Sequence, residues 1–263
     1  MGFISRVLRP AIVMLLALTL ITGAAYPAIV TAIAQVVFPS QANGSMIVVN
    51  GTTVGSSLIG QCFNEPQYFW GRPSAADVTA DNPCGYDANA SAGSNLGPTD
   101  PRLVGFVPGV NTVGLDGSTS ATNPFATTAD PYCVPTDTDG NVVIHPSADT
   151  TYAKNPDGTY VCYSNTILER AIAYRQANGL APNASVPIDI VTTSASGFDP
   201  DISPAAAQSQ VARVAAARTA QGMTEAQIQA AVARHTEQPL LGFLGEPRVH
   251  VLELNLDLDG VIQ

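Results

Sequence analysis

Serine residues in glycine-containing stretches are the first candidates for catalytic chemistry in this sequence. Ser94 and Ser196 each lie next to a glycine in such a stretch, where a hydrolase could present a nucleophile. Serine is also common there because its hydroxyl stabilises turns. The G-x-S-x-G nucleophile elbow is absent. We therefore predict no catalytic residue, and keep a membrane-anchored hydrolase with an unrecognised serine site as an alternative.

Histidine and acidic residues make a weak case for a metal site. The three histidines are isolated from one another, and no H-E-x-x-H motif is present. His235 with Glu237 and Glu246 is the nearest approach to a ligand set, but we interpret His235 as a surface or helix-end residue. Asp199 and Asp201 precede an expected helix start, where carboxylates favour the helix dipole. We prefer that role to general-base catalysis.

Nucleotide-binding loops are absent as well. The sequence contains no G-x-x-x-x-G-K-[ST] loop, and its single lysine, Lys154, follows no glycine-rich stretch. No G-x-G-x-x-G segment follows an expected strand. The residue types alone therefore indicate a binding or assembly module with no cofactor or metal of its own.

A long uncharged run at residues 11–37 is the element around which the chain is organised. A helix rises ~1.5 Å per residue and the hydrocarbon core of a bilayer is ~30 Å thick, so about 20 apolar residues span it. A single strand would leave its backbone groups unpaired in lipid. The run predicts a transmembrane helix at residues 10–37, with Pro27 freeing the carbonyl of Gly23.

A cleaved signal peptide is the alternative interpretation of this run. Arg6 and Arg9 would form its basic start, and A-I-A at residues 32–34 would precede cleavage before Gln35. The apolar part of a signal peptide is only about 7–15 residues long, much shorter than this run. We therefore favour a retained membrane helix over a secreted, cleaved binding protein.

The basic residues predict the orientation of the chain. Arg6 and Arg9 precede the span, and the next basic residue is Arg72. Because positive charge is retained inside, we expect a single-pass plasma-membrane protein. Its cytoplasmic tail would be residues 1–9, and its extracytoplasmic domain residues 38–263.

The external part is strongly acidic, which limits its partners. With two of the 11 Lys and Arg residues in the tail, nine remain against 21 Asp and Glu, a net charge of −12. This balance argues against nucleic acid and against binding to anionic lipid headgroups. Ordinary solubility is the simplest explanation of the acidic surface.

All four cysteines lie on the expected external side, where disulfides form. Four cysteines allow three pairings. We favour the two local pairings, Cys62–Cys84 and Cys133–Cys162, because each closes a loop rich in turn residues. A zinc site is disfavoured by the lack of any C-x-x-C spacing.

Turn and cap signals predict the secondary structure of the external domain. Asn50-Gly51 between two β-rich runs predicts a hairpin with a type I′ turn. Thr166-x-x-Glu169 is a capping-box pattern that predicts a helix ending at residues 178–179. Alternation at residues 186–193 predicts a strand.

The C-terminal third of the sequence also contains signals for both helices and strands. Ser203-Pro204 predicts the start of a helix that runs to Gly222, and Thr224 the start of another. Alternation at residues 248–258 predicts a strand with a bulge. The expected fold class is a transmembrane helix followed by an extracytoplasmic α+β (mixed α/β) domain.

A stretch at residues 99–163 interrupts this domain and is read as a β-rich insertion. Short β-type runs at 140–144 and 159–163 lie among Asn, Pro, Gly, Ser and Asp residues. A structureless stretch of this length is unusual inside a compact domain. We therefore expect a small subdomain that a disulfide holds together.

Within the span, Ala24, Ala28 and Ala32 recur every fourth residue. Small residues at this spacing let a second helix approach closely in lipid. Tyr26 adds a polar atom that could bond across such an interface. These four residues are the candidate contacts to a partner helix, and an incidental alanine-rich span is the alternative.

Taken together, the segments resemble a known family, the C subunit of Kdp-type potassium-transporting P-type ATPases. Each block is short, but their order along the chain is specific. The N-terminal blocks are RP at 9–10, TG at 22–23, YP at 26–27, FP at 38–39, QANGS at 41–45, SLIGQ at 57–61, YFxGRPS at 68–74, YDA at 86–88 and AGSNLGP at 92–98. The C-terminal blocks are VPxD at 186–189, SASGFDP at 194–200, ISP at 202–204, GEPRV at 245–249 and LxLNL at 252–256.

The resemblance implies a noncatalytic accessory subunit of an ATP-driven, high-affinity potassium uptake complex. Its implied partners are a channel-like potassium-translocating subunit, a P-type ATPase catalytic subunit, a small single-span subunit and the lipid bilayer. ATP enters only through the ATPase subunit, whose ATP binding the family's C subunit is described as promoting. Within the matching blocks, Asn43, Arg72 and Asn95 are the candidate extracytoplasmic partner contacts.

Two points of the resemblance stay open. The stretch at 99–163 departs from the family's usual direct passage toward the Thr166 helix, so its disulfide is expected as a feature of this chain. An external domain also fits poorly with direct ATP contact, so we expect it to stabilise the complex from outside. A binding module unrelated to transport, secreted or membrane-anchored, is the alternative function.

Overall fold

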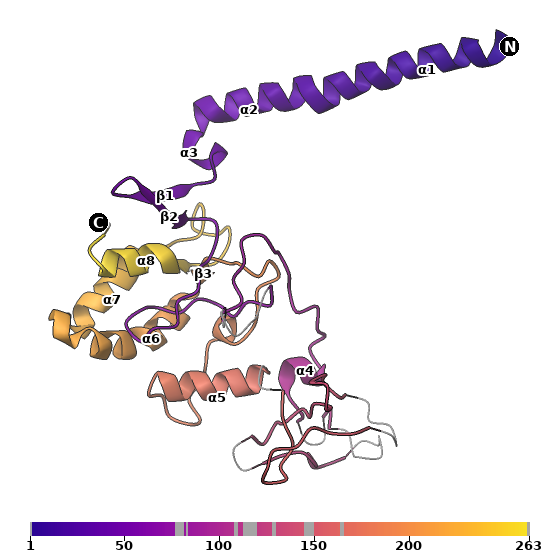
Figure 1. The fold of residues 1–263 in the computed structure, drawn as a ribbon. Helices are drawn as coiled ribbons and strands as arrows, with labels where there is room; N and C mark the ends of the chain where they lie inside the picture. Colours follow the sequence, from indigo (N-terminus) through magenta and orange to yellow (C-terminus); the bar gives the residue numbers. More distant parts are fainter. Residues whose placement is uncertain are drawn as a thin grey trace. The chain divides into compact units, whose positions relative to one another are not determined.

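The computed structural model describes residues 2–76, 82, 84–107, 110–112, 120–127, 130–144, 150–163 and 166–261. It divides into two compact units, residues 1–58 and residues 59–263. Figure 1 labels their helices and strands and colours them in the order of the chain.

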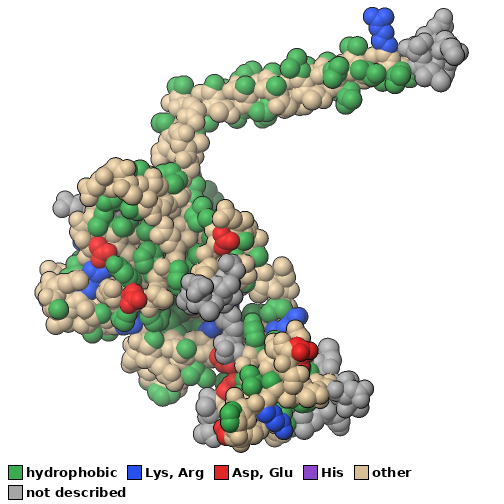
Figure 2. Space-filling view, viewed as in Figure 1, with side chains coloured by type: hydrophobic (Ala, Val, Ile, Leu, Met, Phe, Trp, Pro, Cys, Tyr) green, Lys and Arg blue, Asp and Glu red, His purple; other side chains and the backbone are tan. Residues whose placement is uncertain are grey.

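The first unit begins with a long apolar helix. Helix α1 (Gly2–Leu20), a π-helical turn η1 (Ile21–Ala25) and helix α2 (Tyr26–Val37) follow one another without a break. Val7–Val37 is long and apolar enough to cross a membrane, and none of its most apolar window is buried in the protein. Figure 2 shows hydrophobic side chains along its visible face. The predicted apolar helix is therefore present.

The π-helical turn has a local cause. Pro27 has no backbone N–H, so the regular hydrogen-bond ladder cannot continue through it. The N–H of Tyr26 instead reaches back to the carbonyl of Ile21, and the Thr22 hydroxyl donates to the carbonyl of Leu18 (2.7 Å). These bonds satisfy backbone groups that lipid could not.

After the helix, α3 (Pro39–Ala42) leads into a β-hairpin. Strands β1 (Met46–Val49) and β2 (Thr52–Ser56) pair antiparallel, with Val49 opposite Thr52. The two turn residues, Asn50 and Gly51, have φ values of 51° and 80°. Positive φ at both central positions defines a type I′ turn, so the predicted hairpin is confirmed.

The second unit is a mixed α/β arrangement with small sheets. Its helices are α4 (Pro101–Val104), α5 (Ile167–Ala177), α6 (Pro204–Ala217), α7 (Glu225–Arg234) and α8 (Val251–Leu258), with 3₁₀ turns η2 (Ile188–Ile190) and η3 (Thr219–Gln221). Strands β3 (Asp201–Ile202), β5 (Arg248–His250) and β4 (Thr236–Glu237) form an antiparallel sheet in that order. The main core includes Phe69, Ile190, Ile202, Val211, Val214, Ile228, Val249, Leu254 and Leu258.

The helix starts follow the cap signals in the sequence. Thr166 and Thr224 each form a capping box, with Glu169 and Gln227 respectively. The Ser203 hydroxyl accepts from the N–H of Ala206 at the start of α6 (3.1 Å). These three predicted starts are confirmed. Helix α6 ends at Ala217, earlier than predicted, and a 3₁₀ turn carries the chain to Gly222.

Two predicted strands are wrong. Residues 186–193 contain the 3₁₀ turn η2, which begins directly after Pro187 and buries Ile190 but not Ile188. Residues 248–258 form a strand of three residues and then α8, because the His250 ring accepts from the N–H of Glu253 and caps a helix (3.3 Å). The buried residues of α8 lie at helical spacing, with Val251, Leu254, Asn255 and Leu258 on one side.

The stretch at 99–163 has a small core of its own. Phe106, Phe125, Cys133 and Val134 are buried together, and the Phe125 ring lies 5.1 Å from the Tyr160 ring centroid. The predicted β-type runs appear as isolated bridges, Thr136 to Val142 and Pro135 to Cys162, and not as continuous strands. The predicted disulfides Cys62–Cys84 and Cys133–Cys162 are both present.

Candidate functional site

A cavity of about 390 Å³ lies in the second unit. Its walls are largely apolar and include four aromatic side chains, and two arginines supply its charged groups. The lining residues are Gln61, Phe63, Asn64, Trp70, Gly71, Arg72, Pro73, Ser74, Cys84, Tyr86, Arg170, Ala173, Tyr174, Ala177 and Ile190. Apolar walls with a few polar groups are typical of binding pockets.

Tyr86 is the centre around which one side of this cavity is built. Its hydroxyl donates to the carbonyl of Arg72 (2.9 Å) and lies 3.3 Å from that of Asp199. Its ring also packs so closely on Gly60 that a β-carbon there would lie 2.5 Å from ring atom Cε1. A β-carbon on Gly71 would lie 2.9 Å from the Tyr86 hydroxyl. Burial raises the pKa of Tyr86, so the phenol stays protonated and keeps its donor.

Arg72 is held by partners within the unit. Its Nη1 forms an ion pair with Asp199 (2.9 Å), and its Nη2 donates to the carbonyl of Thr193 (3.3 Å). Its Nε is buried without a hydrogen-bond partner among the described residues. The guanidinium therefore joins the loop that carries Arg72 to residues 193–199 beside the cavity. Its predicted contact with a partner subunit stays a prediction.

Arg170 is the second arginine of the cavity. It lies on α5, where its Nη1 donates to the carbonyl of Val191 (3.0 Å). Desolvation lowers the pKa of its guanidinium. The position of Arg170 at the cavity was not predicted, because nothing in the local sequence distinguishes this residue from an exposed helix residue.

The other predicted contact residues lie elsewhere. Asn43 exchanges hydrogen bonds with the Gln35 side chain (3.1 and 3.2 Å) and donates to the Pro39 carbonyl, so it ties α3 to α2. Asn95 is exposed, with a φ of 53°. In the span, Ala24 lies in the π-helical turn, whereas Ala28 and Ala32 lie in α2. The chain's own fold covers none of the three alanines, and Tyr26 is exposed too.

Two members of the suggested metal site, His235 and Glu237, each pair with another residue. His235 Nε2 lies 3.0 Å from Asp257, while Glu237 pairs with Arg248 (2.6 Å). His235 is also the C-cap residue of α7, as its helix-end interpretation predicts. His145 lies outside the described residues.

The two serines take part in loop packing. The carbonyl of Ser196 accepts from the Ala92 N–H (3.1 Å) and the Ser91 hydroxyl (3.0 Å). Ser94 lines a separate hollow, which it shares with Arg102 and Arg170. Both serines therefore lie in loops that pack against each other, Ser94 in residues 91–97 and Ser196 in residues 193–197.

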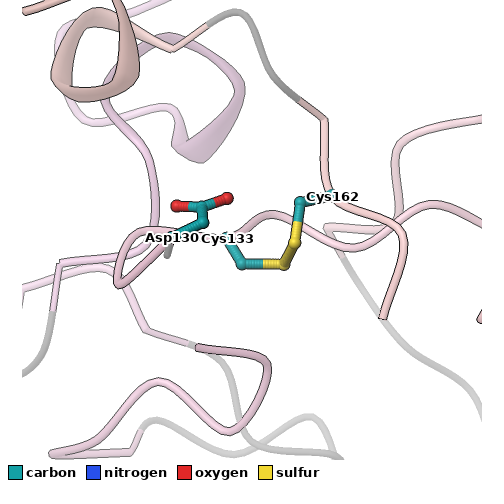
Figure 3. A group of neighbouring side chains, drawn as sticks. All are labelled: Asp130, Cys133 and Cys162. Atoms are coloured by element: carbon teal, nitrogen blue, oxygen red, sulfur yellow. A yellow bond between two sulfur atoms is a disulfide. The ribbon is translucent and has the colours of Figure 1, made fainter. Parts of the chain in front are cut away.

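Asp130 lies close to the sulfurs of Cys133 and Cys162 (Figure 3), with the ligand atoms within 4.8 Å of one another. The two sulfurs are bonded to each other, so neither is a thiolate that could bind a metal ion. Asp130 instead accepts from the N–H of Tyr132 (3.0 Å) and shares a hydrogen bond with Glu169 of α5. The pair of carboxyl groups joins the stretch at 99–163 to α5.

The comparisons with known proteins place these features in a family. A family model described as K+-transporting ATPase, c chain, matches residues 8–137 and 124–260. The chain belongs to the KdpC family. A Potassium-transporting ATPase KdpC subunit of Sorangium cellulosum is 43% identical over 253 residues, covering 96% of this chain and 97% of that one. Those of Variovorax paradoxus and Polaromonas naphthalenivorans are 43% and 41% identical over 256 residues each, and both cover 97% of this chain.

The KdpC relatives correct one expectation about the stretch at 99–163. Their alignments cover nearly all of both chains, so they are of comparable length to this one. The stretch is therefore not peculiar to this chain. The two matches of the family model overlap at residues 124–137, inside the stretch.

Several blocks that carry the KdpC resemblance meet at the cavity. SLIGQ contributes Gln61, YFxGRPS contributes residues 70–74, and YDA contributes Tyr86. SASGFDP joins them through Asp199, which pairs with Arg72. These blocks are far apart in the sequence, so their convergence could be found only in three dimensions.

Glu169 and Asp130 are expected to make the stability of this KdpC-family chain depend on pH. Burial, with the neighbouring Asp130, raises the pKa of Glu169 to about 7. The folded state then binds a proton more tightly than the unfolded state, whose Glu169 titrates near 4.5. Stability from this group is therefore present below pH 4.5 and is lost as the pH rises toward 7.

Glu169→Gln tests this dependence while keeping an acceptor for the Thr166 N–H. We expect the fall in unfolding free energy between about pH 5 and 7.5 to be smaller in the variant than in the wild type. Denaturant unfolding at a series of pH values measures it, with the exposed Glu225→Gln as the control. Parallel curves for Glu169→Gln and the wild type would contradict the prediction.

Proposed function

We propose that this chain is a noncatalytic accessory subunit of an ATP-driven potassium uptake complex. The observation that carries the proposal is the family match along nearly the whole chain. The relatives are named as subunits of a potassium-transporting ATPase. An apolar helix able to cross a membrane supports the assignment, because such a subunit must join a membrane complex.

The proposed orientation puts the N-terminus in the cytoplasm and the second unit outside the plasma membrane. Arg9 precedes the most apolar part of the helix and the next basic residue is Arg72, which fits the positive-inside rule. The two disulfides support an oxidising location for residues 59–263. The partners are a channel-like potassium-translocating subunit, the P-type ATPase catalytic subunit and a small single-span subunit.

The proposed role is assembly and stabilisation of the complex, with the second unit over the potassium entrance of the channel-like subunit. By resemblance, the chain also promotes ATP binding by the ATPase subunit. With the second unit outside, this promotion acts through the assembled complex and not through direct contact with cytoplasmic ATP. Crosslinks from the second unit only to cytoplasmic ATPase loops would overturn this arrangement.

Co-purification tests the proposed function. The full chain, tagged at its C-terminus, is extracted from potassium-starved membranes in mild detergent. We expect a P-type ATPase and a channel-like subunit to come with it in a fixed ratio. Potassium-stimulated ATPase activity should fail in membranes that lack the chain.

The same experiment separates the alternatives. Recovery of the chain alone would favour a binding module unrelated to transport. A soluble chain that begins near Gln35 would show that the apolar run is a cleaved signal peptide. Hydrolase activity lost on alanine replacement of Ser94 or Ser196 would favour a serine enzyme.

A further inference from the structure

The cavity beside Arg72 and Arg170 combines positive charge with apolar walls, and it has no part in the proposed function. Its volume of about 390 Å³ lies in the range of small-molecule sites, which is about 300–1,000 Å³. No Asp or Glu occurs among the described residues that line it. Because the chain as a whole carries a net charge of −10, a positively charged cavity is a local exception. The lining therefore favours an anion over a cation.

Arg72 has a donor left for such an anion. Its Nη1 is paired with Asp199 (2.9 Å), whereas its Nε is buried and has no hydrogen-bond partner within the described part of the chain. A buried donor without a partner costs free energy and calls for an explanation. The Arg72 side chain as a whole is 24% exposed, so a small rotation of the guanidinium would present this N–H to an acceptor in the cavity.

Arg170 supplies the second charge, from α5. Desolvation lowers the pKa of this guanidinium by more than the neighbouring Tyr163 and Glu169 raise it, so the surroundings compensate the charge poorly. Its Nη1 donates to a neutral acceptor, the carbonyl of Val191 (3.0 Å). An anion in the cavity would offset the cost of keeping this charge away from water, and the attraction is stronger there than at an exposed site.

The apolar walls are suited to a flat ring. They include the aromatic side chains of Phe63, Trp70, Tyr86 and Tyr174. Trp70 Nε1 donates to the carbonyl of Glu65 (3.0 Å), and the Arg213 guanidinium lies 3.9 Å from the Trp70 ring centroid. The Tyr174 hydroxyl lies 2.6 Å from that of Ser209. Walls that are already ordered lose little conformational freedom on binding, and aromatic faces stack with a planar ligand.

We infer that this cavity binds a small aromatic carboxylate. The ring lies against the aromatic walls, and the carboxylate lies toward the Arg72 and Arg170 guanidinium groups, which bind carboxylates through paired N–H donors. Asp199 already balances Arg72, so one further negative charge is sufficient to balance Arg170. This count favours a monocarboxylate over a doubly charged phosphate. The inference is independent of potassium transport, because it concerns a cavity within the second unit alone.

Quenching of tryptophan fluorescence tests the inference, because Trp70 is the only tryptophan of the chain and lines the cavity. The full chain in phosphatidylcholine bicelles is titrated with 4-iodobenzoate, whose iodine quenches an indole ring on contact. We expect saturable quenching, and at least tenfold weaker binding of the neutral 4-iodobenzamide. Quenching that only rises linearly with 4-iodobenzoate, or equal affinity for the two compounds, would overturn the inference.

A charge-removing substitution tests the role of Arg170. Arg170→Met keeps an apolar side chain of similar length and should weaken 4-iodobenzoate binding at least tenfold. The matched control is Arg175→Met, because Arg175 is also on α5 and donates to a backbone carbonyl, that of Ala184 (2.8 Å), but does not line the cavity. Equal affinities of the two variants would contradict a role of the Arg170 charge in binding.

A blocking substitution tests the location without removing a charge. Ala173 lines the cavity and is exposed on α5, so Ala173→Phe should fill the cavity and abolish saturable quenching. The control is Gln176→Phe, at an exposed position of the same helix that is not part of the lining. Melting temperatures show whether each variant is folded. If Arg170→Met does not fold, these two variants still decide, because equal saturable quenching in both would overturn the inference.

Discussion

Arg218→Ala is expected to cost this protein about 3–5 kcal/mol of unfolding free energy. The Arg218 side chain is 1% exposed and forms an ion pair with Asp259 (2.7 Å). Its other N–H groups donate to the carbonyls of Gln67 (2.8 Å) and Leu258 (2.9 Å) and to the Gln221 side chain (3.1 Å). Truncation leaves buried acceptors without a donor, which costs free energy at each of them.

The loss should lie toward the lower end of that range, because Asp259 reaches solvent and can be rehydrated. Arg218→Lys should recover only part of the stability, since an ammonium cannot reproduce the fork of guanidinium donors. Chemical denaturation followed by circular dichroism measures both. The control is Arg248→Ala, at an exposed ion pair, which should cost about 1 kcal/mol or less. Equal losses at the two positions would contradict the argument.

Gly60→Ala is the second substitution for which we expect a large effect. A β-carbon at position 60 would lie 2.5 Å from the Tyr86 ring and 2.6 Å from the Asp199 carbonyl oxygen. The backbone also cannot withdraw freely, because the N–H of Gly60 donates to the Phe198 carbonyl (2.8 Å). Overpacking of this kind costs about 1–3 kcal/mol, and the two loops would have to separate to relieve it.

Gly97→Ala is the matched control for this prediction. An added β-carbon at Gly97 meets no atom within 4 Å, and its φ lies outside the left-handed range. There the change should be neutral or stabilise slightly, because alanine restricts the unfolded chain. The melting temperatures of the two variants measure the difference. If both match the wild type, the close packing of Gly60 on Tyr86 does not contribute to stability.

Local signals in the sequence were sufficient for much of the fold. Asn50-Gly51 fixed the hairpin turn, and the Thr166 and Ser203 hydroxyls cap the helices that their positions predicted. Each signal depends on residues within one turn of the chain, so no knowledge of the tertiary structure was required. The local disulfide pairings, favoured because each closes a loop rich in turn residues, are also both present.

The incorrect strands show where such signals fail. The sequence at 248–258 places apolar residues at alternate positions and also at helical spacing, so its pattern fits both structures. The outcome depends on the neighbours: β3 and β4 each pair with two residues of β5, and the His250 cap then starts a helix. The alternation of apolar residues does not indicate how many residues of β5 pair with β3 and β4.

The cavity and the buried arginine were beyond prediction for a related reason. Arg218 follows an alanine-rich helix and looks like an exposed helix-end residue. Its burial depends on Gln67 and Leu258, which are distant in the sequence. Residues 240–244 did carry a signal, four large apolar residues in a stretch of five, but the sequence alone did not show whether these side chains were buried or exposed.

The π-helical turn at Ile21–Ala25 has a consequence for the surfaces that the apolar helix presents. A π-helical turn accommodates an additional residue, and one residue corresponds to about 100° of rotation in an α-helix. The faces of α1 are therefore rotated about the helix axis from the positions that they would have if α1 and α2 were one uninterrupted α-helix. A neighbouring helix that follows Ala28 and Ala32 along α2 meets a different set of side chains along α1. The two halves of the apolar helix thus present two separate surfaces to any helix that packs along them.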